Sequence, residues 1–536
     1  LTSAQIGALT TDGIASFSTD QVAALSAAGV AALSSAQVSA LSTTQLNAFT
    51  TTQLAALSSA AVAGLDTDDV ATISSAEISA INAKTLAGLS TATFAALTST
   101  QLGGLTTAQT GSLGTAQVKA LTTAQIDGLT TAQVGALSSA QIGALTTDGL
   151  ASFSTDQVAA LSAAAVAALS SAQLGALSST QLDAFSTKQL AALSTGAVAG
   201  LSTEDMATIS STEISALSAK TLASIATANF AALTSTQLGG LTATQTGSLG
   251  TAQIKALSTA QIDGLTTAQV GALTSAQIGA LTTDGIASFS TDQVAALSTA
   301  AIAALSSAQV GALSSTQIDA FSTAQLAALS SNGIAGLETG DMVTISSTEI
   351  TALRGSSLAG LSTANFAALT STQLGSLTTG QAASLSTAQI KVLSTAQIDG
   401  LSTAQIGALT SAQVGALSSD NLISLSTDQV AALSTAAVAA LSTTQLDAMS
   451  SDQIGALTAT QVAALGSAAI AALSSQDLLT FSTADIAAIS AKAIAGLSTS
   501  DITNLTTAQQ VAFTTAQIQA MNTDQTNAIV RAYQSI

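Results

Sequence analysis

The chain has 536 residues, of which 47% are hydrophobic and 7% are charged, and it contains no Pro, Cys, Trp or His. Its net charge of −20, with nine Lys and Arg in total, argues against nucleic acid or an anionic membrane as partner, because both are bound through basic side chains. No run of about 18 apolar residues exists, so we expect no membrane span.

An eight-residue repeat runs through the whole chain from Leu1 without a shift in phase. The first three octads read LTSAQIGA, LTTDGIAS and FSTDQVAA, and the 536 residues divide into 67 octads. Position 1 of the octad is a large apolar residue and position 2 is nearly always Ser or Thr. Position 5 is usually Gln, and position 6 is usually Ile, Val or Leu. One octad alone buries too little apolar surface to offset the entropy of ordering its backbone, so neighbouring octads must share a core.

Each octad carries the pattern of a helix start. In residues 33–40, Ser34 is the expected N-cap, Gln37 is its capping-box partner, and Leu33 and Val38 form a hydrophobic staple. One continuous helix is disfavoured, because each octad would rotate the apolar residues by about 80° and leave no apolar stripe. The sequence therefore predicts an all-α solenoid, a superhelix of very short capped helices with one helix per octad. A β-solenoid or cross-β stack is the alternative, motivated by the β-branched content and possible Gln ladders.

A longer period of 136 residues, or 17 octads, is superimposed on the octad. The segment LTTDGIAS at 9–16 returns as LTTDGLAS and then again as LTTDGIAS, followed each time by Phe at position 1: Phe17, Phe153 and Phe289. Duplication of a 17-octad block explains this recurrence, and a match to a structural period of the superhelix is the alternative. Phe17 and Phe49 are four octads apart, which suggests about four octads per superhelical turn.

No catalytic arrangement is visible, because the chain has neither His nor Cys to act as general base, nucleophile or metal ligand. We therefore expect no enzymatic activity. One acidic cluster, Asp66, Asp68 and Asp69, has the oxygen ligands that Ca²⁺ prefers and is a weak calcium candidate. The competing interpretation is a helix cap followed by acidic residues in the first turn, where the helix dipole favours them. No other cofactor is expected.

Oppositely charged residues recur at position 7 of consecutive octads. If adjacent octads stack in register, these charged side chains form surface ion pairs that contribute about 0–1 kcal/mol each. The alternative is that these charges are solvated and never meet. The candidate pairs are Lys119 with Asp127, Lys255 with Asp263, and Lys391 with Asp399.

The last octad breaks the pattern. It reads IVRAYQSI, with Val530 at the cap position, and it holds Arg531 and the single Tyr, Tyr533. We therefore expect a continuous solenoid of 66 octads over residues 1–528 and a divergent cap or junction octad over 529–536. Because the chain does not begin with Met, we expect it to be a processed product or part of a longer protein.

The octad resembles the tandem L-[ST]-x-x-Q-[IVL]-x-A repeats of large bacterial surface and secreted proteins, over the whole chain. This resemblance implies a structural role outside the cell or at its surface. The leading hypothesis is a filament, sheath or surface fibre formed by self-association, with copies of the chain as partners. A monomeric rigid stalk of a large adhesin is the alternative, and an ice- or surface-binding protein with a regular Thr array is a third.

Overall fold

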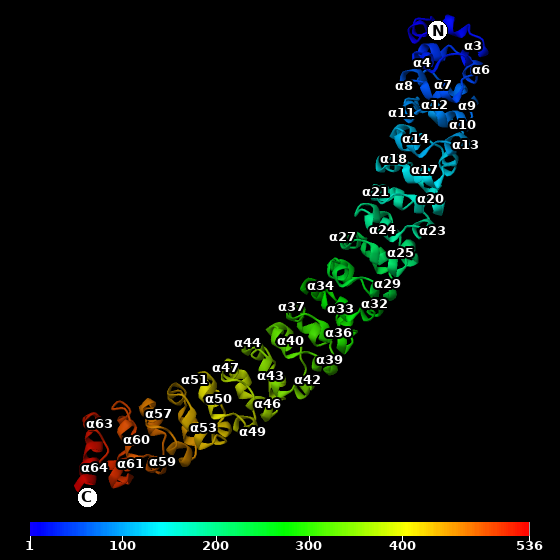
Figure 1. The fold of residues 1–536 in the computed structure, drawn as a ribbon. Helices are drawn as coiled ribbons and strands as arrows, with labels where there is room; N and C mark the ends of the chain where they lie inside the picture. The colour runs from blue at the N-terminus through cyan, green and yellow to red at the C-terminus, as the bar shows by residue number, and fades with distance from the viewer. Residues whose placement is uncertain (535–536) are drawn as a thin grey trace. The chain divides into compact units, whose positions relative to one another are not determined.

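The computed structural model describes residues 1–534, which form 64 α-helices and two 3₁₀ helices and contain no β-strand (Figure 1). Each α-helix begins at position 3 of an octad, from α1 (Ser3–Gly7) to α64 (Thr523–Gln534), and all but α64 have four to six residues. In two octads the helix is replaced by a 3₁₀ helix, η1 (Ala197–Gly200) and η2 (Ile494–Gly496). The predicted all-α solenoid is confirmed, and the β alternative is wrong for the described residues.

In most octads the side chain at position 2 is a hydroxyl that caps the helix beginning directly after it. Ser34 has an extended backbone and caps α5 (Ser35–Ser39), where its Oγ accepts from the N–H of Gln37 at 3.2 Å. The Gln37 Oε1 accepts in return from the N–H of Ser34 at 2.9 Å, which closes the predicted capping box. The next residue in cap conformation comes eight positions later and ends the helix before it can grow. Short helices are therefore encoded locally, octad by octad.

The chain divides into two compact units, Leu1–Gln269 and Val270–Ile536, and each is a stack of octad coils. Within each unit a helix stacks on the helix three octads later, as α4 (Ala27–Ala31) lies between α1 and α7 (Thr51–Ala56). Three octads, or 24 residues, therefore make one coil. The suggestion of four octads per turn is wrong, and Phe17 and Phe49 lie on different sides of the coil.

The core of each unit is built from positions 1 and 6. Leu33 is 2% exposed and Val38 is fully buried, as the predicted staple requires. The largest fully buried side chains are the position-6 residues Phe94, Phe230 and Phe366. Each octad thus contributes two apolar side chains to one continuous interior, which no octad could form alone.

The last two octads merge into one helix, α64, of 12 residues. Val530, at position 2 of the last octad, has no side chain that can cap a helix, and the helix continues through it. Val530 and Tyr533 lie on its exposed side, while Ala528, Ile529 and Ala532 are buried. Residues 529–534 of the octad predicted to be separate therefore continue a helix that begins at Thr523, and its residues 535 and 536 lie outside the described part of the chain. No helix of residues 1–534 has the length and apolar character needed to cross a membrane.

Candidate functional site

The glutamine at position 5 is used twice, and this double use is the main chemical device of the solenoid. Beyond closing its own capping box, Gln37 donates from Nε2 to the carbonyl oxygens of Ile6, at 2.9 Å, and Leu9, at 2.8 Å. Those carbonyls lie 31 and 28 residues earlier, in the coil below. The side chain is 3% exposed. We call this arrangement the glutamine clamp: Oε1 closes the box within the octad, and Nε2 joins the octad to the preceding coil.

The clamp recurs in both units. Gln141 donates to the carbonyls of Thr110 and Leu113, each at 2.9 Å, and Gln461 donates to three carbonyls of its preceding coil at 2.6–3.2 Å. Sequence reasoning predicted the capping half of this role and missed the half that joins the coils. The sequence does contain a sign of this second role. Glu closes a capping box as well as Gln does, yet Glu occupies position 5 only three times. Only an amide can also donate.

The recurring Phe residues at position 1 belong to the core, and their carbonyl oxygens accept hydrogen bonds from clamp glutamines. Phe153 and Phe289 are each 3% exposed, while Phe17 is half-buried. The carbonyl oxygen of Phe17 accepts from Gln45 Nε2 at 2.6 Å, and those of Phe153 and Phe289 accept from the corresponding glutamines. The 17-octad period is not a whole number of three-octad coils, so Phe17 and Phe153 lie on different sides of their unit. Duplication therefore explains the period better than a structural repeat does.

The premise of the predicted position-7 ion pairs is wrong, because consecutive octads lie side by side around a coil and do not stack. Lys119 ends α15 (Thr115–Lys119), which stacks on α12 (Thr91–Ala95) and α18 (Ser139–Ala144). Asp127 ends α16 (Thr123–Asp127), on the next side of the coil. Lys255 and Asp263, and Lys391 and Asp399, hold the same positions in their octads, and the ion pairs themselves stay predictions.

The calcium candidate is a helix cap. Asp66 is the N-cap of α9 (Thr67–Thr72), and its Oδ1 accepts from the N–H groups of Asp68 and Asp69, each at 2.9 Å. Asp69 Oδ2 accepts in return from the N–H of Asp66 at 3.0 Å. Burial raises the pKa of Asp69, and the charges of Asp66 and Asp68 raise it further, against the lowering effect of that backbone hydrogen bond. In residues 1–534 no group of three or more acidic side chains is placed to hold a metal ion.

Four segments lack the glutamine clamp altogether. In each of them five consecutive octads have another residue at position 5, whereas elsewhere such octads occur singly. We call these the glutamine-free segments: residues 57–96, 193–232, 329–368 and 465–504. Their position-5 residues in the second segment are Ala197, Asp205, Glu213, Thr221 and Asn229.

Carboxylates replace the amide in these segments and reverse the hydrogen bonding. Asp205 closes the capping box with the N–H of Ser202 at 2.9 Å, and it accepts from the Oγ of Ser179, in the coil below, at 3.3 Å. In the third segment Asp341 accepts likewise from Ser315 Oγ at 2.8 Å. A carboxylate cannot donate to the carbonyls of the coil below, so a serine hydroxyl must turn toward it instead.

Negative charge accumulates at the second segment. Asp183, at position 7 of the octad of α23 (Ser179–Leu182), lies one coil below Asp205 in α25 (Thr203–Thr208). Desolvation raises the pKa of Asp183, and the charges of Glu213 and Asp205 raise it further. These three carboxylates repel one another across the boundary between two coils.

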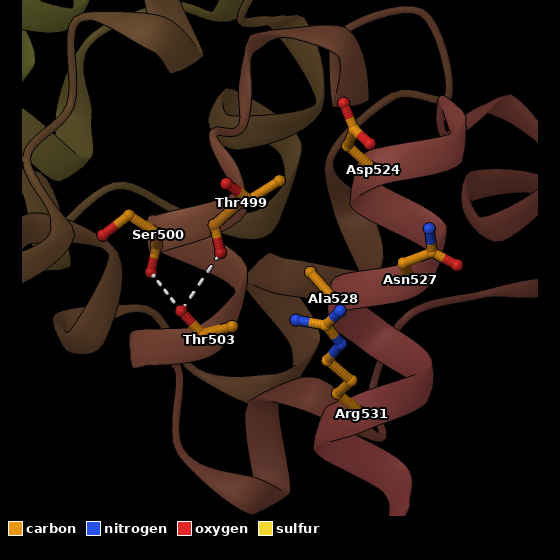
Figure 2. Close-up of a pocket in the computed structure, with 7 residues that line it drawn as sticks. All are labelled: Thr499, Ser500, Thr503, Asp524, Asn527, Ala528 and Arg531. Carbon is orange, nitrogen blue, oxygen red and sulfur yellow. Dashed lines mark hydrogen bonds between the residues drawn. The ribbon is translucent and has the colours of Figure 1, made fainter.

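A polar cavity of about 440 Å³ lies between α61 (Thr499–Asn504) and α64 (Figure 2). Figure 2 shows Thr503 donating to the carbonyl oxygens of Thr499 and Ser500, both at 3.1 Å. Arg531 extends from α64 on the side facing α61, whereas Asn527 points away from it. The guanidinium of Arg531 and the aliphatic hydroxyls are joined in the lining by the carboxylate of Asp524 and by Ala528. Because Asp524 is negatively charged, the cavity is not a purely basic site for an anion.

Comparison with protein families identifies the octads. The family model of the ALTTAQ repeat matches ten stretches, some of them overlapping, that together cover more than half of the chain: 1–27, 14–51, 112–147, 150–187, 247–283, 286–323, 302–339, 383–419, 399–427 and 422–459. No match is found among the curated proteins.

Proposed function

Because the chain belongs to the ALTTAQ repeat family, and because its polar side chains join one octad coil to the next, we propose that it is a structural protein, a spacer and no enzyme. The observation that carries this proposal is the glutamine clamp. The side chains of Gln37 and its counterparts point into the molecule, and the oxygen and the nitrogen of each amide are both hydrogen-bonded there. They are therefore not available to bind a ligand. What repeats in this chain is a means of extending a stack.

The exterior supports a spacer that stays apart from its copies. Positions 3 and 4 present Ser, Thr, Ala and Asp to solvent, and a net charge of −20 opposes close lateral approach. Few large apolar side chains are exposed along the described residues, and of these only Val530 and Tyr533 lie on the same helix, α64. The exposed ones are Leu1, Val343, Val392, Ile423, Val511, Val530 and Tyr533.

We propose that this spacer works outside the cell or at its surface, as the stalk of a larger bacterial protein. That placement is supported by the resemblance of the octad to repeats of bacterial surface and secreted proteins. Self-association into a filament, sheath or fibre is the second candidate. Repetition favours it, since any complementary pair of surface features recurs at each coil and weak contacts then add along the stack.

Negative-stain electron microscopy over a range of protein concentrations separates the two candidates. Separate particles of constant size at every concentration are the expected result for a spacer. Fibres that lengthen as the concentration rises would overturn the spacer and establish the filament. Sedimentation velocity at the same concentrations provides the control, because a drying artefact on the grid would not change the sedimentation coefficient in solution.

A further inference from the structure

The glutamine-free segments are the places where consecutive coils are least tied together. Before the second segment, Gln173 and Gln181 each donate two hydrogen bonds to the coil below, and Gln189 donates three. Within the segment, Thr221 donates one, to the carbonyl of Leu193 at 3.1 Å, and Asn229 donates one, to that of Leu201. Ala197 has no side-chain donor, and the carboxylates of Asp205 and Glu213 can only accept.

The apolar interior continues unbroken through the same coils. Val198, Met206, Ile214, Leu222 and Phe230 at position 6 are all fully buried. The segment is therefore folded and packed like its neighbours, and only the polar connection between coils is reduced. Since packing is non-directional and hydrogen bonds are directional, removing the bonds and keeping the packing lowers the resistance of one coil to tilting on the next.

Charge at this position adds repulsion between neighbouring coils. Asp205, in α25, faces Asp183 at the end of α23 below, while α28 (Thr227–Ala231) above carries no charged residue. Glu213, in α26 (Ser211–Ala216), faces α24 (Thr187–Ala192) with Lys188 below, and α29 (Ser235–Gly239) without a charge above. The remaining charged groups nearby are Glu204 on α25 and Lys220 on α27 (Ala219–Ser224). Like charges on facing coils further weaken the connection that the missing hydrogen bonds have already reduced.

We propose that the glutamine-free segments are joints of the solenoid, more compliant than the clamped coils. Two joints lie in each unit, at 57–96 and 193–232 in the first and at 329–368 and 465–504 in the second. The third repeats the acidic set of the second, with Asp319, Asp341 and Glu349 in the places of Asp183, Asp205 and Glu213. This inference concerns motion inside the stack and holds whether the chain is a spacer or a filament.

Amide hydrogen exchange of the whole chain, normalised to intrinsic rates, tests the proposal. At neutral pH we expect amides of residues 201–232 to exchange about 10- to 100-fold faster than those of 113–144, where every octad carries Gln at position 5, since each octad of the joint has lost one or two hydrogen bonds. Equal exchange in the two stretches would overturn the joint.

A double variant provides the decisive comparison. Asp205→Gln with Glu213→Gln restores the consensus residue of the flanking octads, so we expect it to fold and to slow exchange at 201–232 toward that of clamped coils. The matched control is Asp148→Asn with Asp156→Asn, which removes two exposed charges at position 4 of the same unit. If the control slows exchange at 201–232 as much as the double variant does, net charge and not the clamp governs the segment. Circular dichroism verifies that each variant keeps its helical content.

Discussion

Replacing one clamp glutamine by glutamate isolates the half of the clamp that joins the coils. Gln141, at position 5 of the octad of α18, is 2% exposed, and its Oε1 accepts from the N–H of Ser138 at 2.7 Å. In Gln141→Glu the carboxylate can still close that capping box, and the side-chain volume is nearly unchanged. What disappears are the two donors to the carbonyls of Thr110 and Leu113, which then face a buried carboxylate oxygen.

The magnitude follows from those contacts. Two lost hydrogen bonds contribute about 1 kcal/mol each, and leaving buried polar groups and a charge without donors adds at least about 1 kcal/mol. We therefore expect a local loss of about 3 kcal/mol, which speeds amide exchange at residues 137–144 about 100-fold at neutral pH. Exchange is preferable to a global melting curve, because a stack of repeats unfolds coil by coil and has no single free energy of unfolding.

The matched control for this experiment is Gln21→Glu. Gln21 closes the same capping box, with its Oε1 accepting from the N–H of Ser18 at 2.8 Å, but the side chain is exposed and makes no bond to another coil in the structure. Its replacement should change exchange by less than about twofold, since the box survives and the charge stays in water. Equal effects of Gln141→Glu and Gln21→Glu would refute the clamp as the connection between coils.

Three further outcomes follow from the same geometry. Gly200→Ala should speed amide exchange at residues 193–200, at a cost of about 1–3 kcal/mol, because its Cβ would lie 1.9 Å from the carbonyl oxygen of Ser171. Gly380→Ala, with nothing within 4 Å of the added Cβ, should slow exchange at residues 377–384 slightly. Unchanged exchange in Gly200→Ala would contradict the close contact between coils. Because burial raises the pKa of Asp69, the folded state binds its proton more tightly than the unfolded state does, so the stability of that coil is highest in acid and falls as pH rises through the raised pKa. In Asp69→Asn, the local stability obtained from amide exchange at residues 65–72 should depend less on pH. If its dependence on pH is unchanged, groups other than Asp69 cause it. Calcium should leave the melting curve where magnesium leaves it, since Asp66 and Asp69 are committed to backbone N–H groups; a shift specific to calcium would reinstate the site.

Local features of the fold were predictable from the sequence, and the number of octads per coil was not. Ser34, Gln37, Leu33 and Val38 act within one octad, so their roles as cap, box and staple could be worked out from spacing alone. The number of octads per coil depends on how the extended residues between helices turn the chain, which no side-chain pattern records. The spacing of Phe17 and Phe49 pointed to four because a duplicated residue marks ancestry and does not mark the side of a coil.

The candidate chemistry was predicted less well for a related reason. The Lys119–Asp127 pairing was predicted from octads stacked in register, whereas a helix stacks on the helix three octads away, so the pairing stays a prediction. The glutamine-free segments could have been found in the sequence as runs without Gln, but their meaning depends on knowing that Gln37 Nε2 reaches the coil below. A residue type at one position became informative only after its second partner was known.

A coil of three octads makes the fold indifferent to changes in length by whole octads. After the gain or loss of one octad, every downstream clamp still finds carbonyls 28 and 31 residues back, so the contacts of the interior are kept. The outer surface changes, because each downstream residue moves by a third of a turn around the coil. A 17-octad duplication leaves two octads beyond five full coils, and within the first unit it moved the copy of each surface residue to another side. A partner that recognised one block by its outer face would not meet that face again in the next, so duplication in this chain multiplies reach and dilutes recognition.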